Sequence, residues 1–101
     1  MQKLTAEQAL EFQGKVELLL VTATDTETVA LEGALKPLVG LDDVAVTHIE
    51  NHTYRLGTFA AFAAVHVQCV MGTRAAGSAA STTAEAVRCW TPRAVVMPGI
   101  A

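Results

Sequence analysis

The chain has 101 residues, of which 51% are hydrophobic and 17% charged, and its formal net charge is −3. This length fits one domain or part of one, and the composition excludes intrinsic disorder, because disordered segments are poor in apolar residues and rich in charge. Lys and Arg occur singly along the chain, so there is no basic stripe for a nucleic acid and we expect no nucleic-acid partner.

The N-terminal segment predicts a short helix followed by a buried strand. Thr5 with Gln8 three residues later forms a capping box, which opens a helix through about Phe12. Gly14 is expected to end that helix. The run Val16–Val21 is nearly continuous in apolar residues, as in a strand that is covered on both faces.

A second capping box, Thr24 with Glu27, predicts the next helix. Asp25 adds negative charge where the helix dipole favours it, and Pro37 and Gly40 are expected to close the helix. Its apolar stripe comprises Val29, Leu31, Ala34, Leu35 and Leu38.

The middle of the chain predicts three strands, Val44–Ile49, Tyr54–Phe59 and Ala63–Met71. Ala60 and Ala61 form a tight connection between the second and the third. Gly72 breaks the pattern, and Thr73 can then cap the next helix.

The C-terminal part predicts a helix over Arg74–Trp90 and a short, fully buried strand over Ala94–Met97. The resulting order of elements is typical of an α/β architecture, a layered mixed or mostly parallel sheet flanked by helices. The Ala94–Met97 strand needs cover that the preceding elements supply only in part, and residues 98–101 have the composition of a strand-end loop. We therefore expect the chain to be an incomplete piece of a larger domain.

No targeting or membrane segment is predicted. The first twelve residues contain Glu7 and Glu11 and lack the apolar core of a signal peptide, and no stretch approaches the ~20 apolar residues of a membrane helix. Cys69 and Cys89 have neither the spacing of a zinc site nor that of a redox pair, so we interpret them as free buried thiols. We expect a cytoplasmic location and no membrane partner.

Three segments at strand ends are candidates for chemistry. Glu27, one turn into its helix, either positions a water or a sugar hydroxyl or only completes the capping box with Thr24. Gly72 either exposes backbone N–H groups to a ligand or is a structural turn glycine. Gly99 would allow a ligand to approach the backbone closely.

The histidines do not predict a metal site. His48 and His52 are four residues apart but fall in a strand and a loop, and no third ligand is evident. His66 alternates with Val65 and Val67, as expected of a hydrogen-bonded histidine within a sheet. We expect no metal and no other cofactor.

Taken together, four segments resemble the purine nucleoside phosphorylase/uridine phosphorylase superfamily, with the methylthioadenosine/adenosylhomocysteine nucleosidase branch the most similar. They are Val16–Glu27, Tyr54–Thr58, Val65–Gly72 and Trp90–Ala101. The resemblance implies the phosphorylase/hydrolase-like fold, with residues 1–13 as an N-terminal helical extension and 14–101 as the N-terminal half of the family domain. The remaining ribose and base ligands of the family would belong to the other half.

The resemblance also implies cleavage of the N-glycosidic bond of a purine nucleoside. Glu27 matches the carboxylate that orients the attacking water, and the implied substrate-binding residues are Ala23, Thr24, Met71, Gly72, Gly99 and Ile100. Ile100 stands where the family usually has a serine that can bind phosphate, which favours hydrolysis over phosphorolysis. Val70, where a glycine is common, is a second departure.

The implied partners are a small-molecule nucleoside and either the rest of the parent domain or a homo-oligomer partner. The alternative is a module of a larger signalling or defence protein that senses nucleosides, or mediates an interaction, after losing turnover. Ile100 favours this alternative and Glu27 favours the enzyme. An unrelated α/β interaction domain also stays open.

Overall fold

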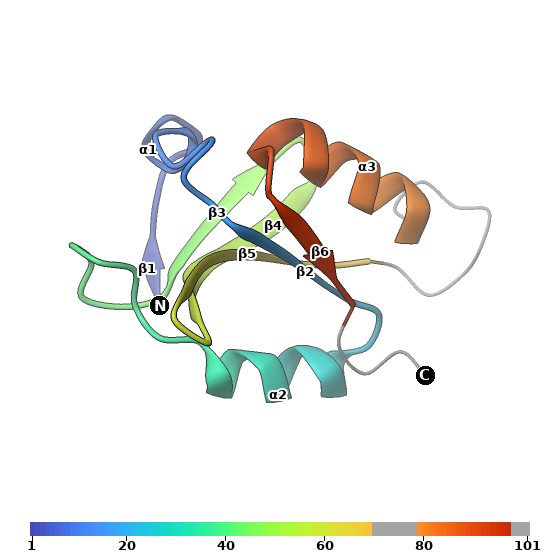
Figure 1. The fold of residues 1–101 in the computed structure, drawn as a ribbon, viewed down its shortest axis with the longest axis horizontal. Coiled ribbons are helices and arrows are strands. Elements are labelled where there is room, and N and C mark those ends of the chain that lie inside the picture. Colours follow the sequence, from blue (N-terminus) through green and yellow to red (C-terminus); the bar gives the residue numbers. More distant parts are fainter. Residues whose placement is uncertain (70–78, 98–101) are drawn as a thin grey trace.

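This computed structural model describes residues 1–69 and 79–97, in which three consecutive strands separate the second helix from the third (Figure 1). Within that part, the strands are β1 (Gln2–Lys3), β2 (Leu18–Thr22), β3 (Ala45–Ile49), β4 (His52–Phe59), β5 (Phe62–Gln68) and β6 (Ala94–Val96). The helices are α1 (Ala6–Leu10), α2 (Asp25–Ala34) and α3 (Ala79–Trp90).

The six described strands form one mixed sheet in the order β1-β3-β4-β5-β2-β6. β2 lies between β5 and β6 and runs parallel to both, β1 is parallel to β3, and the β3–β4 and β4–β5 pairs are antiparallel. This confirms the predicted α/β architecture, and it confirms that the segments predicted as the first, fourth and last strands share one sheet.

Helices cover both faces of the sheet: α2 lies on one face, and α1 and α3 lie on the other (Figure 1). Leu19 and Val21 of β2 join the core on the α1/α3 side, whereas Leu20 joins Leu31 of α2 on the opposite side. This alternation is the period of two that a pleated strand imposes. It explains the nearly continuous apolar run in β2, since both of its faces are buried.

Local signals in the sequence set the helix starts and the hairpins. Both predicted capping boxes form, at Thr5 and at Thr24. Ala60 and Ala61 have φ of 49° and 71°, and residues 50 and 51 have φ of 48° and 70°. Paired positive φ values fit two-residue hairpin turns whose twist matches that of the flanking strands.

The apolar stripe predicted for α2 extends beyond the end of the helix. The helix ends at Ala34, and Leu35 is extended with ψ of 139°, because the residues that lead into Pro37 are disfavoured in the helical region and Lys36 pairs with Thr58. Val29 is 68% exposed, since it lies about 100° around the helix from the buried Thr28.

The last strand was predicted as fully buried, and this is wrong. Ala94–Val96 is exposed throughout, and Met97 after it is 41% exposed. β6 stands at the end of the described sheet beside β2 alone, so one edge and much of its surface face solvent. β1, a strand of two residues, was too short to predict from sequence.

Several predicted features lie outside the described residues, namely Val70, Met71, Gly72, Thr73, the start of the Arg74–Trp90 helix, Gly99 and Ile100. Among the described helices, none is long and apolar enough to cross a membrane.

Candidate functional site

The carboxyl ends of β2, β5 and β6 meet at one edge of the sheet. Because β2 runs parallel to both neighbours, Thr22 lies beside Gln68 and Leu20 lies beside Val96. In open α/β sheets, ligands bind in the crevice outside this edge. The chain passes from β2 into α2 here, so Ala23, Thr24 and Glu27 lie at this edge.

Glu27 is held by backbone N–H groups at the start of α2. Its Oε1 accepts hydrogen bonds from Ala23 N at 2.9 Å and Thr24 N at 3.2 Å, while its own N–H donates to Thr24 Oγ1 at 3.1 Å. The capping-box interpretation of Glu27 is therefore confirmed. The contacts at Oε1 fix the carboxylate at the crevice edge, and the catalytic role of Glu27 stays a prediction.

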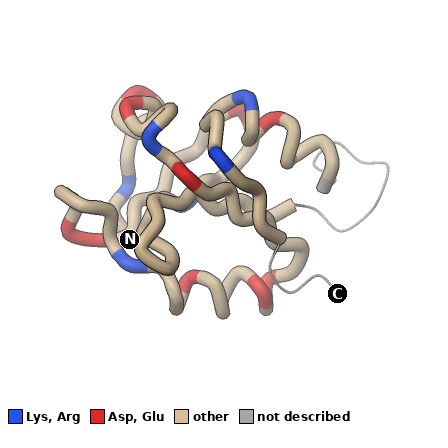
Figure 2. The backbone as a smooth tube through the Cα atoms, viewed as in Figure 1, with Lys and Arg blue, Asp and Glu red and all other residues tan. Residues whose placement is uncertain are grey.

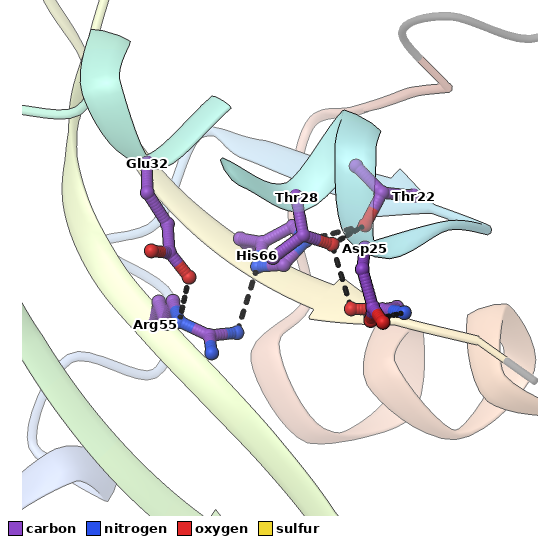
Figure 3. A network of polar contacts seen from close by, with 7 residues as sticks. Thr22, Asp25, Thr28, Glu32, Arg55 and His66 are labelled. Carbon is purple, nitrogen blue, oxygen red and sulfur yellow. Dashed lines mark hydrogen bonds and ion pairs between the residues drawn. The ribbon is translucent and has the colours of Figure 1, made fainter. Parts of the chain in front are cut away.

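A polar network lies behind this turn, between α2 and the sheet (Figure 3). Thr22 Oγ1 is 2.8 Å from His66 Nε2 and 2.7 Å from Thr28 Oγ1. Thr28 donates to Gln68 Oε1 at 2.7 Å, and Gln68 Nε2 donates to Asp25 Oδ1 at 2.9 Å. The network thus joins the interior of the sheet to the first turn of α2.

The donor and acceptor at each link follow from the chemistry of the groups. Arg55 Nη1 lies 3.5 Å from His66 Nδ1, and a guanidinium can only donate, so Nδ1 accepts and the proton of the neutral ring is on Nε2. Nε2–H then donates to Thr22. Because the single hydroxyl proton of Thr28 goes to Gln68, Thr22 must donate to Thr28. The hydrogen bonds therefore run in one direction, from Arg55 to the Asp25 carboxylate.

Burial keeps this histidine neutral. His66 has no exposed surface, and its burial, with a smaller contribution from the Arg55 charge, lowers the pKa of the imidazole to about 4. Arg55 is itself paired with α2, since its Nε lies 2.8 Å from Glu32 Oε1. The Nε–H does not point at that oxygen, so this contact is an ion pair rather than a hydrogen bond.

Sequence reasoning found His66 but missed the network around it. The prediction of a hydrogen-bonded sheet histidine is confirmed by its bonds to Thr22 and Arg55. A signal was present: Asp25, Thr28 and Glu32 have the i, i+3, i+7 spacing of one helix face. That polar face packs towards the sheet beside the apolar stripe on which the α2 prediction rested.

The structure brings Ala23, Thr24 and Glu27 together, and the other four predicted site residues, Met71, Gly72, Gly99 and Ile100, lie outside the described residues.

The other histidines have protein partners. His48 Nδ1 is 3.0 Å from Thr53 Oγ1 across the β3–β4 pair, and His52 Nε2 contacts Glu85 of α3. Residues 1–69 and 79–97 contain no group of three or more His, Cys, Asp or Glu that could hold a metal ion. Cys69 is buried and Cys89 half-buried, and both are free thiols.

Charged residues are dispersed over the described backbone, with no stretch of adjacent Lys and Arg (Figure 2). No model of a known protein family matches the chain. No curated protein matches it either.

Proposed function

We propose that this chain supplies the water-positioning side of a nucleosidase-like site that cleaves the N-glycosidic bond of a purine nucleoside. The observation that carries the proposal is the polar network beneath the first turn of α2, at the carboxyl ends of the parallel neighbours β2 and β5. The resemblance of Val16–Glu27 and Val65–Gly72 to the nucleosidases supports it independently.

In this proposal Glu27 orients the attacking water. The two backbone N–H groups on Oε1 hold the carboxylate in one rotamer, and Oε2 is the oxygen that would accept a proton from water. A carboxylate within hydrogen-bond reach of the water acts as a general base, taking a proton from the water while the N-glycosidic bond between the sugar and the purine breaks. Ala23 and Thr24 would line the sugar, together with Met71, Gly72, Gly99 and Ile100.

The test replaces Glu27 by Gln in the full-length protein. Glutamine is the other residue that completes a capping box, and its amide oxygen can accept the same two N–H groups, so the fold should survive. Loss of the carboxylate should reduce release of free base by roughly 10²–10⁴-fold, as for other general acid–base groups.

Free base is measured from purine nucleosides with and without phosphate, and Glu7→Gln, at an exposed position of α1, serves as a matched variant outside the site. Unchanged turnover in Glu27→Gln would remove Glu27 from the mechanism. If release of the free base requires phosphate, the reaction is phosphorolysis and not hydrolysis. That result would contradict the expectation drawn from Ile100, which stands where the family usually has a phosphate-binding serine.

The second candidate is a nucleoside-binding module without turnover, in a larger signalling or defence protein. The capping box favours it, because the cap alone accounts for the position of Glu27. This candidate predicts saturable nucleoside binding, with amide shifts at Ala23 and Thr24, and no release of base. Binding that is unaffected by Glu27→Gln would support it over the enzyme.

A further inference from the structure

A cavity lies on the other side of the sheet from α2, where α1, α3 and the β3–β4 turn meet. Its volume is about 300 Å³, and its lining includes Leu10, Ile49, Glu50, Tyr54 and Glu85. This volume is at the lower end of the range for small-molecule sites. The cavity shares no residue with the polar network behind α2, so it is separate from the proposed active site.

Tyr54 is the central polar group of the cavity. It is 2% exposed, and its ring is fixed edge-on against Trp90 at 5.4 Å and tilted against His52 at 5.9 Å between centroids. Within residues 1–69 and 79–97 no hydrogen bond to its hydroxyl is found, and this oxygen is not fully enclosed by protein. The hydroxyl therefore reaches the cavity that Tyr54 lines, where it can accept a hydrogen bond from a ligand.

Two carboxylates give the cavity a negative field. Burial raises the pKa of Tyr54 to about 12, and the nearby Cys89, Glu85 and Glu50 contribute in that order. Burial and Glu50 also raise the pKa of the Cys89 thiol. Burial is the larger cause of both shifts, and the carboxylates add the smaller effect of nearby negative charge.

One cation, Arg88, also lines the cavity, so the two carboxylates outnumber it by one. Arg88 and Glu50 are both exposed, and a long side chain such as that of Arg88 keeps its guanidinium in water. His52 contacts Oε2 of Glu85, which leaves Oε1 as the Glu85 oxygen that a new donor would use. Leu10 and Ile49 supply an apolar wall.

We propose that this cavity binds a small aliphatic amine in its ammonium form, with the nitrogen donating to the Tyr54 hydroxyl and to Glu50 and Glu85, and the carbon chain against Leu10 and Ile49. An ammonium offers three donors and no acceptor, which matches a site of carboxylate and hydroxyl oxygens. An anion could accept a hydrogen bond from the Tyr54 hydroxyl and meet Arg88, but both carboxylates would repel it.

The test compares three probes that share a four-carbon chain: n-butylammonium, butan-1-ol and butanoate. Amide shifts of the 101-residue chain are followed by NMR at constant ionic strength. Butylammonium should give saturable shifts around Tyr54 and Cys89, with a dissociation constant on the order of millimolar for a ligand this small. Equal binding of butanol, tighter binding of butanoate, or no saturable shift would overturn the proposal.

Two variants locate the ammonium. Tyr54→Phe keeps the ring against Trp90 and removes the hydroxyl, and Glu50→Gln removes one charge; each should weaken butylammonium binding by about fivefold, the loss of one hydrogen bond. Asp42→Asn makes the same charge change before the opposite end of β3 and should leave binding unchanged. Melting temperatures verify that each variant is folded. Equal affinity in wild type, Tyr54→Phe and Glu50→Gln would refute the assigned contacts.

Discussion

His66 shows how one buried side chain can order the polar groups around it. A neutral imidazole has one donor and one acceptor nitrogen, and the Arg55 guanidinium, which can only donate, makes Nδ1 the acceptor. Every link from Nε2–H onward then has a determined direction, up to the Asp25 carboxylate. Protonation of Nδ1 would place a proton against the guanidinium and break the first link.

This arrangement predicts that stability falls with pH below the ordinary pKa of histidine. The pKa of folded His66 is about 4, below the ordinary histidine value of 6.5, so between these values the unfolded chain binds the extra proton. The stabilisation from neutral His66 is fully present above pH 6.5 and is lost progressively down to about pH 4. Linkage gives a loss of up to about 3 kcal/mol in the free energy of unfolding. Urea unfolding at several pH values measures it.

Carboxylates also titrate in part of this pH range, so variants are needed to separate the contribution of His66 from theirs. His66→Gln should abolish most of the slope between pH 6.5 and 5, at a cost in stability at neutral pH. His48→Gln, at an exposed position, should keep the wild-type slope. A slope that persists in His66→Gln would assign the effect to other groups.

At the scale of elements, local chemistry was predictable and packing was not. The capping boxes at Thr5 and Thr24 and the Ala60–Ala61 turn depend on residues within a few positions, and each formed as predicted. The end of α2 depends on the pairing of Lys36 with Thr58 of β4. No local pattern contains that pairing, so the predicted helix was too long.

Gly57 is the residue that permits this pairing. β3 begins at Ala45, opposite Leu56, and beyond that pair Lys36 exchanges backbone hydrogen bonds with Thr58 at 2.6 and 3.0 Å. A Cβ on Gly57 would lie 2.8 Å from the Lys36 carbonyl oxygen, which is backbone and cannot turn away.

Gly57→Ala should therefore lower the free energy of unfolding by about 1–3 kcal/mol, as overpacking does. Gly33→Ala is the matched control, because nothing lies within 4 Å of its Cβ and alanine favours the helix by roughly 0.5–1 kcal/mol. Urea midpoints should move in opposite directions for the two variants. A shift of the same sign in both would mean that the contact with Lys36 is relieved at little cost.

At the scale of the whole molecule, the two faces of the sheet differ in chemistry. The α1/α3 face contains Tyr54, Trp90 and the larger apolar cluster, whereas the α2 face contains the His66 network. Apolar runs predicted that β2 and β5 share a sheet and are covered on both sides. The polar network on the α2 face was not predicted, because the links that join α2 and β2 to β5 connect residues 40 or more positions apart, such as Thr28 and Gln68.

Incomplete cover of the last strand was predicted, whereas its exposure along the whole of β6, at the end of the described sheet, was not. An apolar run in an edge strand and one in a central strand have the same pattern, and only the strand order distinguishes them. Val95 and Val96 are 41% and 38% exposed beside β2, so the described structure presents an apolar edge with unpaired backbone groups.

Such an edge is a template for pairing with another chain, and we expect the 101-residue chain to self-associate through β6. Val95→Lys places a charge on the strand, the feature that natural edge strands use to prevent pairing, and should shift the chain towards monomer. Val39→Lys makes the same change at a loop residue that is 99% exposed, so it controls for net charge and should leave association as in the wild type. Sedimentation velocity over a range of concentrations measures both. A wild-type chain that stays monomeric throughout, or an equal effect of the two lysines, would show that β6 is not the associating edge.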